Sequence, residues 1–315
     1  MAQSGHRGDD GRRSAAGHPG RVVASCAAIV PAYRSEATIA RALESLVGQG
    51  AALSRILAVC SDRPSADAAR SIAGVEVVEL GKRVTAGRAR NIGRQCAGEV
   101  SLLLFVDADC VLPAGAVTEL AQELESCGLA ILAAAVRPSD SRPVSWVRHL
   151  LEFKDFEPGG ARRWPDLVPS AALLCRSEWF DTAGGFPDLW PGEDFVFCRR
   201  VAARGGRVAC SRRVAATHFH ECRWTELLAH QFRLGRTSAM ARRMSGLPGY
   251  ALAERPWSAT LLGAGRLGRC ALWVARRQPR SAVRGILWSP VIAALLASWA
   301  AGFAAGGRAG LEIAR

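Results

Sequence analysis

The stretch that decides the fold is Val100-Ser-Leu-Leu-Leu-Phe-Val-Asp-Ala-Asp109, a short apolar run that ends in two aspartates. A run this short and this apolar is typical of a strand buried on both faces, as in the middle of a parallel sheet. Side chains alternate along an extended chain, so Asp107 and Asp109 project to one side. Two carboxylates at the carboxyl end of a central strand suit a hard divalent cation, which can bind a substrate diphosphate. An isolated Asp-x-Asp favours a solvated turn, so the flanking chain decides between the two.

Strand and helix patterns alternate along the first 140 residues. Short apolar runs predict strands over residues 22–31, 56–60, 75–80, 100–106 and 129–136. Helical spacing predicts helices between them, over residues 38–47, 65–72, 85–97 and 114–125. This alternation predicts an α/β fold, a doubly wound and mostly parallel sheet with helices on both faces. Ligands of such sheets bind at the carboxyl ends of the strands, where Asp107 and Asp109 lie.

Beyond Pro138 the pattern is less regular, with helices predicted over residues 146–156, 195–204 and 224–244. We divide the chain into a disordered tail (1–20), a nucleotide-sugar-binding half (21–140), an acceptor-binding and catalytic half (141–250) and a basic amphipathic region (251–315). The tail has no apolar run, so it can neither bury enough surface to order itself nor act as a secretory signal.

The ten cysteines contain no Cys-x-x-Cys pair, which argues against a zinc site and a redox pair. Several lie inside apolar strands, and free buried thiols favour a reducing, cytosolic compartment. The net charge of +13 is almost all arginine. It would suit a nucleic acid, but the basic C-terminal cluster adjoins an apolar segment and has no aromatic stacking pattern. We therefore expect an anionic lipid surface and no nucleic acid.

The C-terminal region combines that basic stretch with a long uncharged segment. The stretch is free of acids and contains Arg266, Arg269, Arg276, Arg277, Arg280 and Arg284. The segment Ile286–Ala305 follows, and about 20 uncharged residues can cross a bilayer as a helix. It is also Ala-rich, interrupted by Pro290 and only moderately hydrophobic, which favours instead a buried helix or a helix in the membrane plane. We expect membrane association through this segment and leave crossing and in-plane binding open.

In their order along the chain, these pieces resemble the family 2 glycosyltransferases, which have the GT-A fold. The matching pieces are Ile29-Val-Pro-Ala-Tyr33 with Glu36, Asp62, Gly87-Arg-Ala-Arg90-Asn91, Phe105-Val-Asp-Ala-Asp109, Gly184-Gly185-Phe186 and Glu193-Asp194. The resemblance covers about residues 24–245. It implies transfer of a sugar from a nucleotide-diphosphate-sugar to an acceptor hydroxyl, usually with inversion.

The resemblance also assigns roles on the leaving-group side. Asp109 would bind Mn²⁺ or Mg²⁺, and Asp107 would contact the ribose or share the metal, whose charge stabilises the departing diphosphate. His218 is a further candidate metal ligand, although a lone histidine is more often structural. Arg88 and Arg90, in the first turn of a helix, would contact the phosphates; the alternative for both is a solvated helix face.

For the nucleotide, the resemblance places Pro31, Ala32, Tyr33 and Glu36 around the base and ribose. Asp62 would accept a hydrogen bond from the base edge, or simply cap a helix. The chain departs from the family here: Arg34 stands where Asn is common, and Cys60-Ser-Asp-Arg-Pro64 replaces Asp-Asp-Gly-Ser. The base therefore stays open. Arg233 and Arg236 lie three apart on a predicted helix and could close over the donor.

Glu193 and Asp194 resemble the acidic pair that the family places near the acceptor. Inverting transfer needs a base within hydrogen-bond reach of the attacking hydroxyl. We expect Asp194 to be that base and Glu193 to orient the acceptor or its loop. The alternative is that both acids stabilise a helix N-terminus.

The sequence thus predicts an inverting, non-processive, hexosyltransferase-like enzyme at the cytoplasmic face of the plasma membrane. Its acceptor would be a cell-envelope or lipid-linked glycan. One alternative is a catalytically silent sugar-binding or scaffold relative, favoured by the altered stretch around Asp62. Another is a nucleotidyltransferase, disfavoured because the first strand lacks a Gly-rich loop for a triphosphate.

Overall fold

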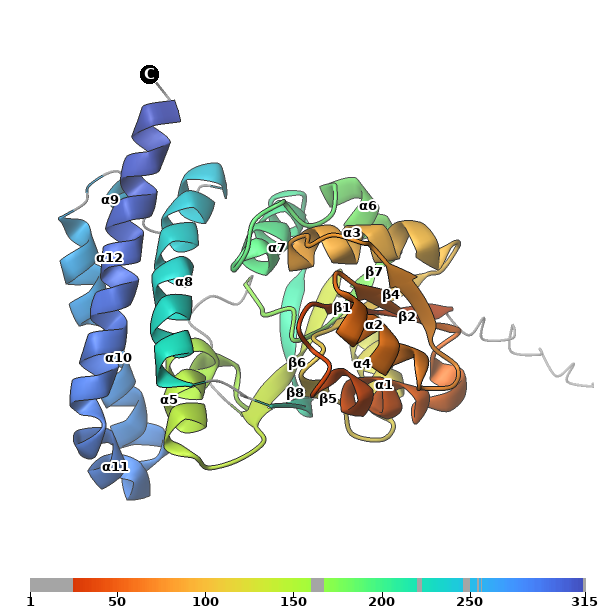
Figure 1. The fold of residues 1–315 in the computed structure, drawn as a ribbon, viewed down its shortest axis with the longest axis horizontal. Helices are drawn as coiled ribbons and strands as arrows, with labels where there is room; N and C mark the ends of the chain where they lie inside the picture. The colour runs from red at the N-terminus through yellow and green to blue at the C-terminus, as the bar shows by residue number, and fades with distance from the viewer. Residues whose placement is uncertain are drawn as a thin grey trace, which may run out of the picture.

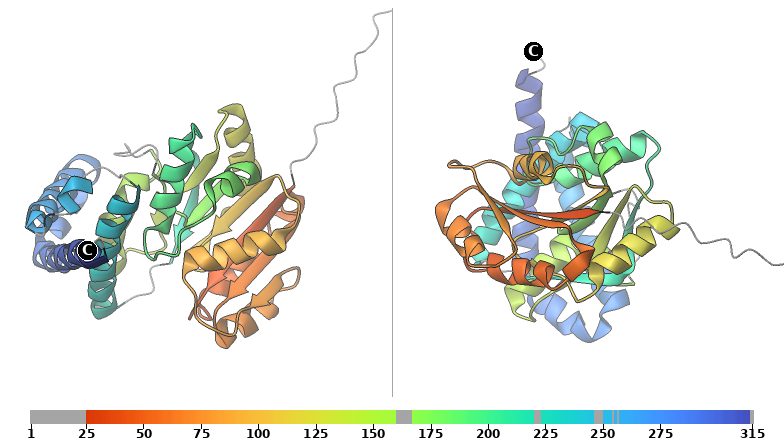
Figure 2. Two further views of the ribbon diagram at one scale, coloured as in Figure 1. Left: turned by 90° about the horizontal axis from the view of Figure 1, so that it is seen from above. Right: turned by 90° about the vertical axis from the view of Figure 1, so that its right-hand side faces the viewer.

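The computed structural model of the chain describes residues 25–159, 167–219, 223–245, 250–253, 255 and 257–313. These residues form an α/β part built on one sheet and a layer of helices beside it (Figure 1). Figure 2, in its left view, shows the sheet on one side of the molecule and the long helices on the other. The tail predicted over residues 1–20 lies outside the described residues.

One mixed sheet of eight strands carries the α/β part. Its strands are β1 (Cys26–Ala32), β2 (Arg55–Cys60), β3 (Glu76–Glu79), β4 (Leu102–Val106), β5 (Cys110–Val111), β6 (Ile131–Pro138), β7 (Ala172–Arg176) and β8 (Val208–His218). Their order in the sheet is β3-β2-β1-β4-β7-β6-β8-β5. The first four are parallel, which confirms the predicted wound half. Strand β7 runs antiparallel to both β4 and β6, so the second half is mixed.

Helices cover both faces of the sheet, as predicted (Figure 1). One face carries α1 (Ile39–Val47), α2 (Arg63–Arg70) and α4 (Ala116–Ser126). The other carries α3 (Ala86–Ala97), α6 (Ser177–Ala183) and α7 (Glu193–Ala203). Neighbouring residues of β4 enter different cores: Leu104 joins Leu120 in the first, and Phe105 joins Phe180 in the second. The continuous apolar run therefore reflects burial on both faces.

The helical layer lies beside the α/β part, separate from the helices that cover the two faces of the sheet (Figures 1 and 2). It consists of α5 (Pro143–Glu152), α8 (Trp224–Ser245), α9 (Tyr250–Ala253), α10 (Ser258–Arg277), α11 (Ala282–Leu287) and α12 (Ser289–Ile313). The sequence predicted one apolar helix over residues 286–305, but Ile286 and Leu287 belong to α11. A new helix starts at Ser289, and Pro290 lies in its first turn, where a missing N–H costs no hydrogen bond.

Helices α8 and α12 pack backbone against backbone. A Cβ atom at Gly302 would lie 2.0 Å from the Phe232 carbonyl oxygen, and one at Gly235 would lie 1.9 Å from that of Trp299. Only glycine permits such an approach. The segment Ser289–Gly307 of α12 is long and apolar enough to cross a membrane, with a mean hydropathy of 1.5. Helix α8 covers one side of this segment, and 44% of the segment is buried inside the protein.

Candidate active site

A cavity of about 1590 Å³ lies between the α/β part and the helical layer. The turn after β4, the N-terminus of α7 and the end of β8 form one wall, with Asp107, Asp109, Asp194 and His218. Helices α5, α8, α10 and α12 contribute the opposite wall. The residues predicted to bind the leaving group and the predicted base thus face one shared space.

Backbone hydrogen bonds hold the two aspartates beside His218. The Cys110 amide donates to the Asp107 carbonyl oxygen at 2.9 Å, which closes the turn after β4. Cys110 then pairs with His218 where β5 meets β8 in antiparallel register. The Phe219 amide donates to the Asp109 carbonyl oxygen at 2.8 Å. The turn is therefore fixed to the last residues of β8.

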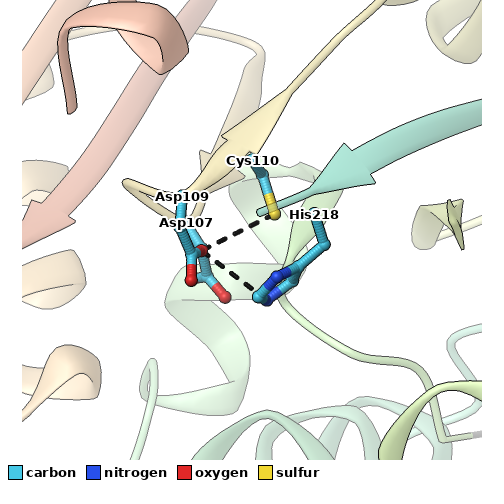
Figure 3. Close-up of side chains that lie close together, drawn as sticks. All are labelled: Asp107, Asp109, Cys110 and His218. Carbon is cyan, nitrogen blue, oxygen red and sulfur yellow. Dashed lines mark hydrogen bonds and ion pairs between the residues drawn. The ribbon is translucent and has the colours of Figure 1, made fainter. Parts of the chain in front are cut away.

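Four potential ligand groups converge at this point, as Figure 3 shows: Asp107, Asp109, Cys110 and His218. One ligand atom of each lies within 4.8 Å of the others. Nε2 of His218 is 3.6 Å from Oδ1 of Asp109. Burial lowers the pKa of His218 well below its usual 6.5, so the ring is neutral at pH 7 and offers a lone pair.

Two carboxylates and a neutral imidazole fit a divalent cation, and the imidazole favours a transition metal such as Mn²⁺. Cys110 fits less well, because burial raises the pKa of its thiol well above the usual 9.0 and keeps the sulfur protonated. Burial also raises the pKa values of Asp107 and Asp109. A bound cation would remove the cost of ionising both side by side.

Arg90 of α3 lies at the centre of a buried ion-pair chain. Its side chain is 2% exposed, and it donates to Oδ1 of Asp107 and to Oε1 of Glu193, at 2.6 Å each. Its guanidinium carbon also lies 5.1 Å from the ring centre of Phe186. Burial works to lower the pKa of Arg90, but the two carboxylates outweigh it and raise that pKa. The sequence predicted a phosphate contact for Arg90; in the structure its donors hold two carboxylates instead.

Asp194 has a different environment from its neighbour Glu193. Gly192, with a φ of 101°, directs the chain into α7, and the Asp194 carboxylate lines the cavity. Its oxygens accept hydrogen bonds from the amides of Ser170 at 3.1 Å and Phe195 at 2.8 Å. Burial, followed by the charge of Glu193, raises the pKa of Asp194 to about 7. A carboxylate with this pKa can accept a proton near neutral pH.

The end of the cavity next to β1 is cationic, and the aromatic ring of Tyr33 lies there. Tyr33 follows β1, and the guanidinium carbons of Arg34 and Arg83 lie 5.4 Å and 4.7 Å from its ring centre. Arg34 adopts a φ of 53°, in the left-handed region that Asn tolerates better than Arg. Its amide donates to Oδ2 of Asp62 at 2.9 Å.

The other oxygen of Asp62 is buried and accepts no hydrogen bond from any described residue. Asp62 precedes α2 but makes no side-chain capping bond there, so helix capping does not explain it. It is not on the cavity lining, although Arg34 and Ser61, its hydrogen-bond partner and its neighbour in sequence, both are. The free oxygen leaves Asp62 able to accept a hydrogen bond.

The structure brings most of the predicted residues to one cavity. Those on its lining are Pro31, Ala32, Tyr33, Arg88, Arg90, Asp107, Asp109, Glu193, Asp194, His218 and Arg233. Glu36, Asp62 and Arg236 are not among them. Glu36 and Arg236 are exposed, and the backbone of Arg236 packs against Gly306 of α12. Arg236 therefore does not close over the cavity in this conformation.

The sequence analysis missed the residues of the helical wall and one aromatic. Trp190 lines the cavity beside Arg233, whose guanidinium carbon is 5.5 Å from its ring centre. Glu152 of α5 accepts a hydrogen bond from Gln231 of α8 at 2.8 Å. Arg266 of α10 completes this wall. Which side chains these helices present to the cavity depends on how separate helices pack together, which the sequence pattern does not show. The one usable signal in the sequence was that Trp190 closely precedes Glu193 and Asp194.

Two family models match the chain. Residues 27–178 match the model described as glycosyl transferase family 2. Residues 167–275 match the model described as glycosyl transferase family 21. The first match includes Asp107 and Asp109, and the second includes Asp194 and His218 and extends into α10. No curated protein matches significantly.

Solved structures share the fold at low sequence identity. A mannosyltransferase from Pyrobaculum calidifontis, in complex with GDP-Man and Mn²⁺, matches with a TM-score of 0.57 and 17% identity, over 87% of this chain and 85% of the other. S. aureus TarS 1-349, in complex with UDP-GlcNAc, matches with a TM-score of 0.50 and 15% identity, over 91% and 92%. At these identities the likeness shows the GT-A fold alone.

Proposed function

Since this chain carries a glycosyl transferase family 2 domain over residues 27–178, we propose that it transfers single sugars, with inversion and with a divalent cation, from a nucleotide-diphosphate-sugar to an acceptor hydroxyl. The observation that carries the proposal is the shared cavity. Asp107, Asp109 and His218 offer ligand atoms within 4.8 Å of one another, and Asp194 lines the same space. A leaving-group site and a base in one cavity are what a single displacement needs.

The donor would lie along the α/β wall. Tyr33 lines the cavity and places an aromatic ring near the base, and Asp62, which lies off the lining, would support the base site through the hydrogen bond that it accepts from the Arg34 amide. Arg88 also lines the cavity and would contact the diphosphate. GDP-Man and UDP-GlcNAc are bound by the two structurally similar proteins. We therefore expect a guanosine or uridine diphosphate sugar, with the base undecided.

The acceptor hydroxyl would attack the anomeric carbon from the face opposite the diphosphate. Asp194 takes the hydroxyl proton as the new C–O bond forms and the bond to the diphosphate breaks. A Mn²⁺ or Mg²⁺ ion held by Asp107, Asp109 and His218 would supply positive charge for the departing diphosphate.

Glu193 and Arg90 act through other residues in this scheme. The ion pair between them ties the start of α7 to α3, and the second donor of Arg90 fixes Asp107. Arg90 thus holds the base side and the metal side of the cavity at a constant separation. We assign Arg90 and Glu193 as positioning residues.

We propose that the enzyme works at the cytoplasmic face of the plasma membrane on a cell-envelope or lipid-linked glycan. Helices α10 and α11 support this, because they expose large apolar side chains next to arginines. Val283, Ile286 and Leu287 are 77%, 74% and 69% exposed. Arg276, Arg277 and Arg280 are exposed beside them. Exposed apolar side chains that adjoin exposed arginines suit an anionic lipid surface.

A donor screen tests the enzymatic proposal. The purified chain is incubated with Mn²⁺ and a panel of UDP- and GDP-sugars, and nucleoside diphosphate release is measured. We expect release with at least one donor and a loss of about 100-fold or more in Asp109→Asn. Asp67→Asn, an exposed acid on α2, is the matched control. No release with any donor, together with unchanged nucleotide binding by Asp109→Asn, would contradict the proposal and favour a silent relative.

A further inference from the structure

The cavity lining beside β1 contains cations but no acid. We call the lining residues within 31–38, 61 and 82–88 the β1 end of the cavity. Its charged side chains are Arg34, Lys82, Arg83 and Arg88, and no described lining residue in these ranges is an Asp or a Glu. Guanidinium and ammonium groups donate hydrogen bonds and accept none. The charged side chains at this end therefore favour a ligand group that presents acceptors.

Arg34 is held in one backbone conformation. Its φ of 53° lies in the left-handed region, which a residue other than glycine keeps only where its surroundings fix it. The Arg34 amide donates to Oδ2 of Asp62 at 2.9 Å, and the next amide, of Ser35, donates to Oγ of Ser65 at 2.9 Å. Asp62 itself is not on the lining. The acid that could have bound a donor group of the base thus fixes an arginine that lines the cavity.

The order of the strands indicates which part of a sugar donor lies at the β1 end. Asp107 follows β4, Tyr33 follows β1 and Arg83 comes after β3, and the order of these strands is β3-β2-β1-β4. Neighbouring strands lie about 4.8 Å apart, so β3 is about 14 Å from β4. A nucleoside diphosphate that extends along this edge from a cation at the end of β4 brings its base to Tyr33, Arg34 and Arg83.

We infer that Arg34 selects guanine as the base of the donor, by donating a pair of hydrogen bonds to O6 and N7. The inference rests on the proposed function, since it names the base of the nucleotide that the cavity binds. Guanine presents these two acceptors side by side, and they match the paired N–H groups of one guanidinium. Uracil places its N3–H donor between its two carbonyl oxygens, so the same arginine meets only one acceptor. The donor class is therefore a guanosine diphosphate sugar.

The binding of nucleoside diphosphates, without any sugar transfer, tests this inference. GDP, 7-deaza-GDP, UDP and CDP are titrated into the full chain in the presence of Mn²⁺, with binding followed by calorimetry. All four carry the same ribose and diphosphate, so a difference in affinity reports the base. In 7-deaza-GDP the N7 acceptor alone is replaced by C–H. We expect GDP to bind about tenfold or more tighter than each of the other three.

Two substitutions of Arg34 separate its paired donors from its charge. Arg34→Gln and Arg34→Lys should both lower the affinity for GDP to that for UDP and leave the affinity for UDP unchanged. Lysine keeps the charge but has no paired planar donors, so a loss in Arg34→Lys is not explained by attraction to the phosphates. Arg63→Gln is the matched control, because Arg63 directly follows Asp62, has a side chain that is 83% exposed and is not on the lining. It should bind GDP like the wild type.

The outcomes that overturn the inference differ from those that overturn the proposed function. UDP or CDP binding as tightly as GDP in the wild type overturns the inference and leaves sugar transfer from another donor intact. Equal losses for GDP and UDP in Arg34→Gln show a phosphate contact, and unchanged GDP binding in both Arg34 variants shows no contact; each overturns the inference. Wild-type affinity for UDP shows that a variant is folded. A GDP preference that depends on Arg34, without transfer from any GDP-sugar, contradicts the proposed function alone.

Discussion

At the residue scale, two adjacent acids at the start of α7 differ in what each contacts. Both line the cavity, but Glu193 is ion-paired with Arg90, whereas the carboxylate of Asp194 accepts hydrogen bonds from two backbone amides. Burial raises the pKa of both acids. Because Glu193 is held in its ion pair, Asp194 is the acid that stays available to a substrate hydroxyl. A sequence pattern that names both acids cannot assign the base, and the structure supports Asp194.

The raised pKa of Asp194 predicts a pH profile. The base works as the carboxylate, and its carboxylate fraction rises as the pH passes through about 7. We therefore expect kcat to climb between about pH 6 and 8 and then level off. Asp194→Asn should lower kcat by about 100-fold or more and keep nucleotide binding unchanged. Initial rates measure kcat, and calorimetric titrations measure nucleotide binding. If kcat of the wild-type protein does not change between about pH 6 and 8, Asp194 is not the base.

Arg90 and Arg94 allow a matched comparison on one helix. Both lie on α3 and pair with carboxylates, but Arg90 is 2% exposed whereas the Asp181 partner of Arg94 is 51% exposed. Arg90→Gln leaves the buried carboxylate of Glu193 and the half-buried carboxylate of Asp107 without their cation, and it should lower the free energy of unfolding by about 3–5 kcal/mol. Arg94→Gln should lower it by at most about 1 kcal/mol. Urea denaturation measures both values. Equal losses of unfolding free energy in the two variants would show that the ion pairs of Arg90 have no special role in stability.

At the element scale, glycines decide how α8 meets α12. Gly302→Ala places a methyl group 2.0 Å from the Phe232 carbonyl oxygen, so the two backbones must separate. We expect a loss of about 1–3 kcal/mol in unfolding free energy, because overpacking shifts the backbone. Gly268→Ala on α10 is the control: its Cβ meets nothing within 4 Å. It should stabilise the helix by about 0.5–1 kcal/mol. Thermal unfolding compares them, and a neutral Gly302→Ala would refute the close contact.

The sequence predicts the elements of the wound half well, because each depends on a local pattern. The strand predicted over residues 100–106 is β4 (102–106), and the helix predicted over residues 85–97 is α3 (86–97). The direction of strand β7 could not be predicted in this way. It runs antiparallel to β4 and β6, and this pairing is not visible in the sequence of β7 itself. Direction within a sheet is a non-local property, which periodicity does not carry.

The residues of the candidate site also differ in how far the sequence predicts them. Asp107, Asp109 and Asp194 follow strand ends or begin a helix, so local pattern and family resemblance place them correctly on the cavity. Arg90 was predicted on the cavity, but its two carboxylate partners come from distant segments and were not foreseen. Arg266 was recognised only as part of a basic stretch. Its contact with Trp299 requires α10 and α12 to pack together, which no single segment specifies.

At the scale of the whole molecule, the cavity is formed only when the helical layer covers the α/β part. The donor residues belong to the sheet, whereas Arg233 and Arg266 come from α8 and α10. The same α10 exposes apolar side chains on its outer face, away from the cavity. A membrane that contacts α10 and α11 would therefore lie on the outer side of the helical wall.

This arrangement predicts that α11, and not α12, makes the main membrane contact. Ile286 and Leu287 are 74% and 69% exposed, while Ile292 and Leu295 of α12 are buried against other helices. The double variant Ile286→Asp/Leu287→Asp should weaken binding to vesicles with anionic lipid at least tenfold, since burying one such side chain is worth about 1.5–3 kcal/mol. Val47→Asp, an exposed position on α1, is the control. Vesicle flotation at low and high salt measures the binding, which salt should also weaken. If the double variant floats like the wild type and carbonate at pH 11 fails to extract either protein, α12 crosses the bilayer and the surface-bound arrangement is wrong.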